Sequence, residues 1–139
     1  MSATGVGPRD ADRSPFVVTT SWDDGCPGDL RIAERLATLG LKGTFYIPRQ
    51  SPGGPRMTEA QIRELAGYPG VEIGSHTLTH PDLDRLDADR FRVEVEGGKQ
   101  WLEDLIGEPV SSFCYPRGKF TGQMRDLSLI HISEPTRPY

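Results

Sequence analysis

Short apolar runs alternate with helix-length amphipathic segments along this chain, and that alternation most restricts the folds that the chain can adopt. The runs are rich in β-branched and aromatic residues and are bounded by Pro, Gly or polar residues, which is typical of strands. We expect strands at 16–22, 43–47, 71–73 and 110–115. Because helix-length segments separate these strands, the order β-α-β-α-β-α-β predicts an α/β fold with a parallel sheet.

Helix-end signals define the first two expected helices. Asp29 predicts an N-cap for a helix over 30–39, and Gly40 suits the left-handed position that closes it. A capping-box sequence at 58–61 opens a second, short helix that Gly67 ends.

The longest expected helix covers 88–106, with Asp87 as its N-cap. Two consecutive glycines, Gly97 and Gly98, lie inside it and weaken a helix by about 1–2 kcal/mol relative to alanines. This pair predicts a kink or a close approach of another segment.

Composition excludes several classes of function. The 139 residues are 35% hydrophobic and 26% charged, with a formal net charge of -4. The chain is therefore too apolar for global disorder, offers no basic patch for nucleic acid, and contains no apolar run of about 20 residues to cross a membrane. Residues 1–14 read as a flexible polar leader without the apolar core of a signal peptide, so we expect a cytoplasmic protein.

Polar residues follow the predicted strands at the points where they end. Asp23 and Asp24 come after the first strand, His76 and His80 after the third, and 115–117 after the fourth. Active sites of parallel α/β folds lie at the carboxyl ends of the strands, so we expect these groups to meet at one edge of the sheet.

One carboxylate and two neutral imidazoles form an open three-ligand site for a divalent metal. Asp24, His76 and His80 fit Zn2+, with Co2+, Mn2+ or Fe2+ as alternatives, and Asp23 remains free to act as a base. Two adjacent carboxylates after a buried strand are costly unless a cation compensates them. The alternative interpretation is a surface Asp-Asp-Gly turn and two surface or capping histidines.

Three motifs resemble those of a known family. Residues 21–25 (Ser-Trp-Asp-Asp-Gly), 75–80 (Ser-His-Thr-Leu-Thr-His) and 113–118 (Phe-Cys-Tyr-Pro-Arg-Gly) are similar to the first three motifs of the polysaccharide deacetylase family, the NodB-homology domain of carbohydrate esterases. The similarity extends over 16–126. It implies that 15–126 is the incomplete N-terminal part of a distorted (β/α) barrel of the NodB-homology, glycoside hydrolase/deacetylase type.

The resemblance implies hydrolysis of an N-acetyl group from an amino sugar, oligosaccharide or sugar conjugate. Family roles would make Asp23 the general base and Asp24, His76 and His80 the metal ligands. A backbone N–H at Arg117 would help the metal to hold the oxyanion.

Other family features concern the third motif and the later ones. Tyr115 and Pro116 would wall the acetyl pocket. Cys114 stands where the family usually has an arginine that pairs with the base, so the base lacks that cation unless Arg117 reaches it. Later family motifs, including the His that serves as general acid, are absent, which implies that this polypeptide carries the metal ligands and the base but lacks the acid.

The C-terminal segment resembles translated sequencing adapter. Residues 127–137 (Leu-Ser-Leu-Ile-His-Ile-Ser-Glu-Pro-Thr-Arg) can be encoded by the transposase adapter used to build sequencing libraries. We therefore expect 127–139 to be a non-native tail, assign His131 no catalytic role, and expect the natural protein to continue past Asp126. The alternative is a genuine amphipathic helical segment.

Two other functions remain open from the residues. Related folds hydrolyse small ureides or imides, some of them without metal. A non-catalytic module that binds metal or carbohydrate would also fit a chain without the acid.

Overall fold

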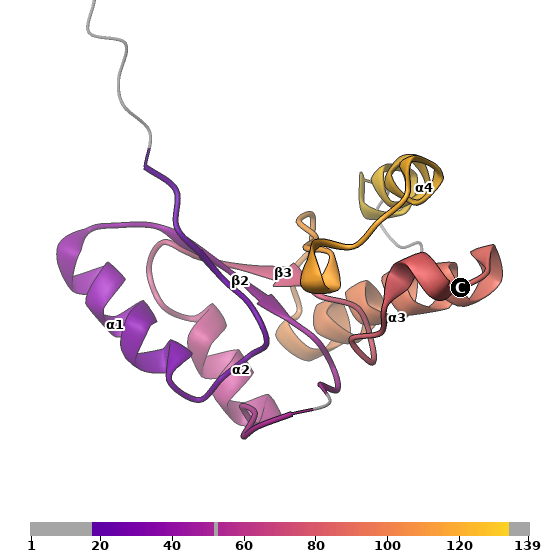
Figure 1. Cartoon of the computed structure of the whole chain (residues 1–139). Helices are drawn as coiled ribbons and strands as arrows, with labels where there is room; N and C mark the ends of the chain where they lie inside the picture. Colours follow the sequence, from indigo (N-terminus) through magenta and orange to yellow (C-terminus); the bar gives the residue numbers. More distant parts are fainter. Residues whose placement is uncertain (1–17, 52, 134–139) are drawn as a thin grey trace, which may run out of the picture.

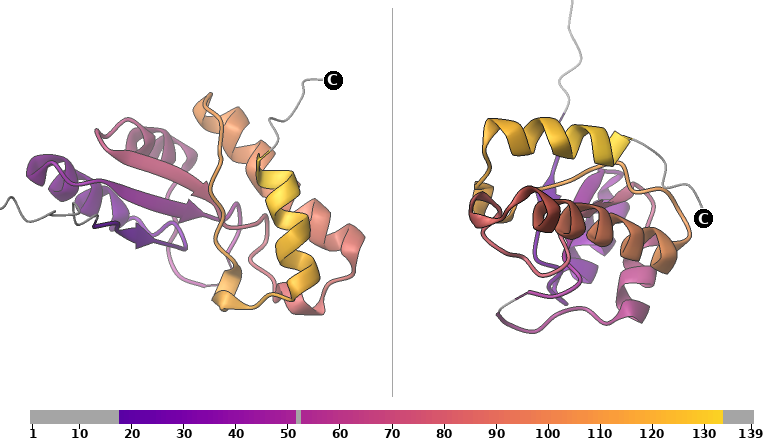
Figure 2. Two further views of the ribbon diagram at one scale, coloured as in Figure 1. Left: turned by 90° about the horizontal axis from the view of Figure 1, so that it is seen from above. Right: turned by 90° about the vertical axis from the view of Figure 1, so that its right-hand side faces the viewer.

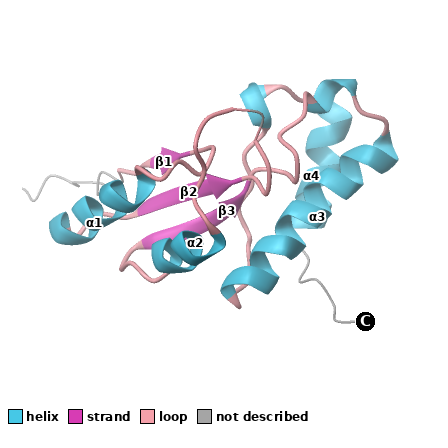
Figure 3. Ribbon diagram, turned by 90° about the horizontal axis from the view of Figure 1, so that it is seen from below, coloured by secondary structure: helices cyan, strands magenta, loops and turns pink. Residues whose placement is uncertain are grey.

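The computed structural model describes residues 18–51 and 53–133. Its three strands form one parallel sheet in the order β1-β2-β3, and Figure 3 shows their arrowheads pointing toward the same end of the molecule. The elements are β1 (Ser21–Trp22), α1 (Asp29–Leu39), β2 (Gly43–Ile47), α2 (Glu59–Ala66), β3 (Val71–Ser75), α3 (Ala88–Ile106) and α4 (Gly122–Ser133), with single 3-10 turns at Leu83–Arg85 and Pro116–Gly118.

The core lies between the sheet and its helices. In Figure 1, α1 and α2 lie side by side along one face of the sheet, and α3 lies beyond the end of β3. Phe45 and Ile47 on β2 are buried, whereas the alternate residues Thr44 and Tyr46 are only half-buried, so the strand alternates as its pattern predicts. Phe45 also stacks on Trp22 of β1, with ring centroids 5.1 Å apart.

The predicted α/β fold with a parallel sheet and the helix-end signals at α2 and α3 are confirmed. The Thr58 hydroxyl accepts a hydrogen bond from the Gln61 N–H at 3.3 Å, and the Gln61 side chain accepts one from the Thr58 N–H at 2.9 Å. Asp87 accepts from the Arg90 N–H at 2.8 Å. Gly40 is left-handed, with φ 65°, at the end of α1.

The first strand is shorter than predicted. Residues 16 and 17 lie outside the described residues, and among 18–22 only Ser21–Trp22 pair as a strand. The Thr20 hydroxyl donates to the Lys42 carbonyl at 2.8 Å, so a side chain makes a contact there that a strand would make through its backbone.

The predicted strand at 110–115 is wrong. Only Phe113 forms a bridge, to Ser75, through the Ser75 N–H to Ser112 carbonyl bond and the Cys114 N–H to Ser75 carbonyl bond. The ladder ends there because β3 itself ends at Ser75. At the other end, the Val110 N–H donates to the Glu103 carboxylate at 2.9 Å instead of to a strand.

Asp29 is not the N-cap of α1. Gly28 occupies that position, and Asp29 is the first helical residue, with only 5% of its surface exposed. Its carboxylate accepts a hydrogen bond from the backbone of Cys26 rather than capping the helix.

The C-terminal helix α4 lies alongside α3 (Figure 2). It extends from Gly122 into the segment that resembles adapter, and Ser128 on it is buried and hydrogen-bonded to the Tyr115 hydroxyl. The boundaries at 14/15 and 126/127 stay predictions. No helix among the described residues combines the length and apolar character that a membrane crossing requires; the cytoplasmic location also stays a prediction.

The glycine pair of α3 is a point of close packing, not of kinking, since α3 runs unbroken from Ala88 to Ile106. A methyl group added at Gly98 would lie 2.8 Å from the carbonyl carbon of Thr77 and 2.9 Å from the Ser75 hydroxyl. Only glycine therefore lets α3 approach the backbone that follows β3.

We predict that Gly98→Ala destabilises the chain by about 1–3 kcal/mol, because the added methyl group meets backbone that cannot move aside, and this cost exceeds the roughly 1 kcal/mol gain in helix propensity. Urea denaturation measures the change. Gly97→Ala is the matched control: its methyl group would meet only the flexible end of Leu78, so its midpoint should change little. A Gly98→Ala variant as stable as Gly97→Ala would contradict the close-packing account.

Candidate metal and hydrolase site

The carboxylates of the first motif and the imidazoles of the second meet at the carboxyl edge of the sheet. His80 Nε2 lies 3.1 Å from Asp24 Oδ1, and His76 Nε2 lies 3.6 Å from the same oxygen. Asp23 Oδ2 lies 4.0 Å from His76 Nε2. The structure thus brings together the four residues that the sequence singled out.

The ring of His76 is fixed from behind. Its Nδ1 lies 2.8 Å from the Cys114 carbonyl oxygen, and a carbonyl only accepts, so Nδ1 carries the proton. Nε2 is then the lone-pair nitrogen. It is buried and has no hydrogen-bond partner among the described residues.

Burial, opposed by the hydrogen bond to Cys114, lowers the pKa of His76 from 6.5. The neighbouring His80 ring, whose centroid is 4.9 Å away, lowers the same pKa further, and the two aspartates act in the opposite direction. His76 is therefore held neutral at neutral pH, which is the form that binds a metal.

Glu94 of α3 holds the loop between the two histidines. Its carboxylate accepts from the Leu78 N–H at 3.0 Å, the Thr79 N–H at 2.8 Å and the Thr79 hydroxyl at 2.6 Å. Within the loop, the Thr77 hydroxyl accepts from the His80 N–H at 3.0 Å. These bonds satisfy the backbone of a loop that has no ladder or helix of its own.

Backbone strain gathers at the three motifs. Among the described residues, the non-glycine residues with left-handed φ are Asp24 (69°), Thr77 (74°), His80 (55°) and Arg117 (56°). Each such conformation costs on the order of 1 kcal/mol and persists only where the surroundings impose it. Two of the four are candidate metal ligands.

The aspartates are more exposed than their position after a strand suggests. Their side chains are 61% (Asp23) and 50% (Asp24) exposed, whereas those of His76 and His80 are 1% and 9% exposed. The argument that burial makes this carboxylate pair costly is therefore wrong for the described residues. The evidence for a functional role of the two aspartates is their short distance from the imidazoles.

The donor set fits a divalent metal. Ligand atoms of Asp24, His76 and His80 all lie within 4.8 Å of one another. Nitrogen and oxygen atoms bound to one tetrahedral Zn2+ lie about 3.3 Å apart, close to the observed 3.1 and 3.6 Å. The unpartnered, buried Nε2 of His76 is the atom that most needs such a ligand.

Two residues to which the sequence assigned no role belong to this neighbourhood. Ligand atoms of Asp23, His76 and Cys114 also lie within 4.8 Å of one another. Asp29 is buried nearby, and its pKa is raised to about 6: desolvation is the main cause, Asp23 and Asp24 add to it, and the bond from Cys26 acts in the opposite direction. The sequence did not indicate that Asp29 lies near the candidate site, because its position before the first helix predicted a capping role instead.

The side chains of residues 115–117 in the third motif have other partners. Arg117 Nη1 donates to Asp82 at 2.5 Å, so the structure pairs this arginine with Asp82 rather than with the base. Tyr115 stacks on Phe120, with ring centroids 4.6 Å apart, and Pro116 is buried. The substrate-contacting roles of Tyr115, Pro116 and Arg117 stay predictions.

We predict that His76 titrates below pH 6.5 in the metal-free chain and carries its proton on Nδ1 when neutral. Because its folded-state pKa is lowered, its contribution to stability is fully present above pH 6.5 and is lost as the pH falls through the folded-state pKa. Long-range 1H–15N NMR spectra of the imidazoles report both the pKa and the tautomer. A proton on Nε2 would show that the Cys114 carbonyl does not fix this ring, and a pKa at or above 6.5 would show that burial does not lower the pKa of His76.

The chain is similar in sequence to curated proteins. Among curated proteins, the chain is 27% identical over 114 residues to the "Putative polysaccharide deacetylase YxkH" of Bacillus subtilis (strain 168), a match that covers 81% of this chain and 40% of that protein. The chain thus spans well under half the length of the curated relatives that it matches.

Solved structures share the fold. The Streptococcus pyogenes deacetylase PplD in complex with acetate superposes with a TM-score of 0.72 at 19% identity, over 81% of this chain and 51% of that one. The family 4 carbohydrate esterase from Streptomyces lividans in complex with acetate gives 0.66 at 22% identity, over 82% and 58%. The described fold is therefore the N-terminal part of this barrel type, and it is incomplete.

The family model described as "Polysaccharide deacetylase" matches residues 10–129, most of the sequence and all three motifs. The predicted resemblance is confirmed: the chain belongs to the polysaccharide deacetylase family.

Proposed function

We propose that this chain is the metal-binding part of a metal-dependent hydrolase that removes the N-acetyl group from an amino sugar or polysaccharide. The observation that carries the proposal is the convergence of Asp24 Oδ1 with the Nε2 atoms of two buried histidines, one of which has no other partner. Two of the matched structures support the reaction class, since one is a deacetylase and the other a carbohydrate esterase, each in complex with acetate.

In the proposed reaction, Asp24, His76 and His80 hold the metal and Asp23 acts as the base. A bound Zn2+ or similar ion would polarise the acetamide carbonyl and lower the pKa of a water molecule. Asp23 lies on the same side as the ligands and is 61% exposed, so a water molecule can reach its carboxylate and lose its proton to it. The Arg117 N–H would donate to the developing oxyanion.

The leaving amine must gain a proton, and we propose that this acid comes from a motif later in the full-length protein. The family's general-acid His belongs to such a motif, and this sequence contains none of the later motifs. The chain is therefore proposed to supply the metal site and the base for a reaction that the longer protein completes.

We predict that Asp24→Asn and His76→Ala each weaken Zn2+ binding to the 139-residue chain by at least tenfold, because each removes one of three ligands. Competition with a chromophoric chelator measures the affinity. Asp84→Asn, which makes the same side-chain change on the exposed surface, is the control and should leave the affinity unchanged. Unchanged Zn2+ stoichiometry and affinity in both ligand variants would refute the assignment of the metal site.

We predict that the protein extended into its natural downstream sequence releases acetate from N-acetylated amino sugars or chito-oligosaccharides when loaded with Zn2+. In that protein, Asp23→Asn should lower kcat by about 10²–10⁴-fold while the bound Zn2+ stays the same, because a base is lost and no ligand is. A metal-loaded extended protein that releases no acetate from any of these substrates would refute the proposed reaction. Loss of Zn2+ from Asp23→Asn would instead show that the two aspartates have exchanged roles.

A further inference from the structure

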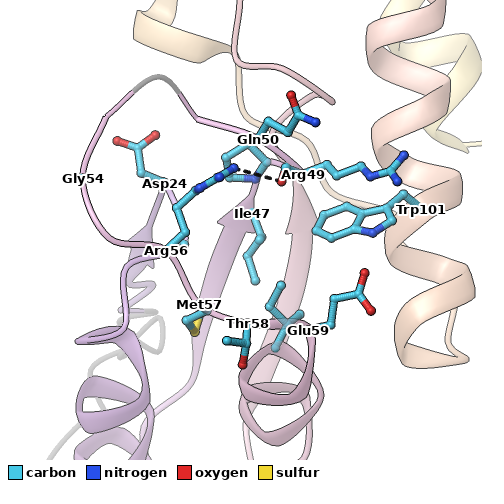
Figure 4. A pocket seen from close by; sticks show the side chains of 13 residues that line it. Asp24, Ile47, Arg49, Gln50, Gly54, Arg56, Met57, Thr58, Glu59 and Trp101 are labelled. Carbon is cyan, nitrogen blue, oxygen red and sulfur yellow. Dashed lines mark hydrogen bonds between the residues drawn. The ribbon is translucent and has the colours of Figure 1, made fainter.

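A pocket of about 540 Å³ opens beside the candidate site, within the range of roughly 300–1,000 Å³ typical of ligand pockets. Asp24 forms part of its wall, so the pocket begins where the proposed metal site ends. Its other walls come from the segment after β2, the segment before α2, and Trp101 of α3 (Figure 4). A ligand whose acetamide lies at Asp24 would extend into it.

Two arginines are the positive charges of this pocket, which the acids Asp24 and Glu59 also line. Arg49 and Arg56 line it, and both are exposed. The Arg56 guanidinium donates to the Arg49 carbonyl at 3.3 Å, which leaves its charge uncompensated. Among the described residues neither arginine forms an ion pair, whereas Glu59, the acid on the opposite wall, lies 3.8 Å from the Arg63 guanidinium.

Both arginines are anchored to the motifs of the candidate site. The N–H groups of Arg49 and Gln50 donate to the carbonyls of Thr77 and Leu78 in the histidine loop, at 3.3 and 2.7 Å. On the other side, the N–H of Met57, next to Arg56, donates to the Gly25 carbonyl at 2.9 Å. Backbone hydrogen bonds therefore hold the segments that carry the two arginines next to the motifs of the candidate site.

The remaining wall suits a sugar ring. Trp101 presents an indole to the pocket, with the Arg49 side chain extending toward it in Figure 4. Indole faces pack against the apolar C–H faces of carbohydrates, and guanidinium groups bind carboxylates and phosphates through paired N–H donors. The chain as a whole has a net charge of -4, so two arginines without an ion pair at one pocket favour negatively charged ligands there and not over the whole surface.

We propose that this pocket binds an anionic substituent of the substrate, so that the substrate is an acidic N-acetylated amino sugar carrying a carboxylate or a phosphate. This inference rests on the proposed function for the acetamide end, and adds the requirement for negative charge. Arg49 and Arg56 bind the anion, and Trp101, on the side of the pocket opposite Asp24 in Figure 4, packs against the sugar.

Sugar binding to the 15N-labelled, metal-free chain at low salt tests the proposal by NMR titration. The probes are N-acetylmuramic acid, which carries a carboxylate, N-acetylglucosamine 1-phosphate, and neutral N-acetylglucosamine. We expect at least one anionic sugar to bind five- to tenfold more tightly than the neutral one, with the preference falling in 0.5 M NaCl. The stronger of the two anionic probes identifies the substituent as carboxylate or phosphate.

The double variant Arg49→Gln/Arg56→Gln should reduce this preference to less than twofold. Arg35→Gln, which removes an exposed arginine on α1, is the matched control and should keep the preference. Equal affinity for all three sugars, no binding of any of them, or a preserved preference in the double variant would overturn the proposal. Because the titration uses no metal and detects no acetate, its failure would leave the proposed reaction standing, and absent acetate release would leave this result standing.

Discussion

The hydrogen bond from His76 Nδ1 to the Cys114 carbonyl is the interaction on which the candidate site depends. It sets the tautomer of His76, aims its Nε2 toward the aspartates, and does so from a residue 38 positions away in the sequence. The same Cys114 donates its N–H to the Ser75 carbonyl. Cys114 thus pairs with the end of β3 through its N–H and orients the His76 imidazole through its carbonyl. The short bridge at Ser75 and Phe113 is enough for this, although it is less than a full strand.

Close packing and strain follow from that arrangement. Once Ser75 is pinned to Ser112 and Cys114, the chain must turn away at once, and Thr77 does so with a left-handed φ of 74°. The turn is feasible because Gly98 lets α3 approach the Thr77 backbone, and because Glu94, one helical turn earlier on α3, bonds the next two N–H groups. The cost of the strained backbone is thereby offset by the neighbouring helix.

Much of the fold was predictable because it follows from local patterns. β2, α2 and α3 have period-2 or helical patterns with clear end signals, and their described bounds match the predicted ones closely. The segment 110–115 has the composition of a strand but not the pairing, because its pairing depends on where β3 turns away. The prediction of Asp29 as a cap was wrong for a similar reason. A capping residue and a buried acid look alike in sequence, and only the tertiary structure shows that Asp29 is buried.

The four central site residues were predictable because position after a strand, and not spacing alone, marked them. Neither position after a strand nor spacing identifies a side chain whose partner comes from a distant part of the sequence. Arg117 pairs with Asp82, from the segment after the histidine loop, and the contact of Cys114 with Asp23 and His76 joins all three motifs. Arg49 and Arg56 carried no motif at all, and only the folded pocket places them together.

The two halves of the candidate site differ in how they are held, and this couples the pocket to the metal ligands. The imidazoles are buried, the His76 ring is hydrogen-bonded to the Cys114 carbonyl, and Glu94 of α3 holds the loop between them, whereas Asp24 lies on an exposed turn after a two-residue edge strand. That turn is held at Gly25, which is buried with φ 65°; a side chain there would lie 3.2 Å from Ile47. The Gly25 carbonyl accepts the Met57 N–H, and Met57 follows Arg56 in the pocket wall. The backbone at Met57 is thus bonded directly to the residue after Asp24, so a ligand that shifts this backbone acts on the turn that carries Asp24.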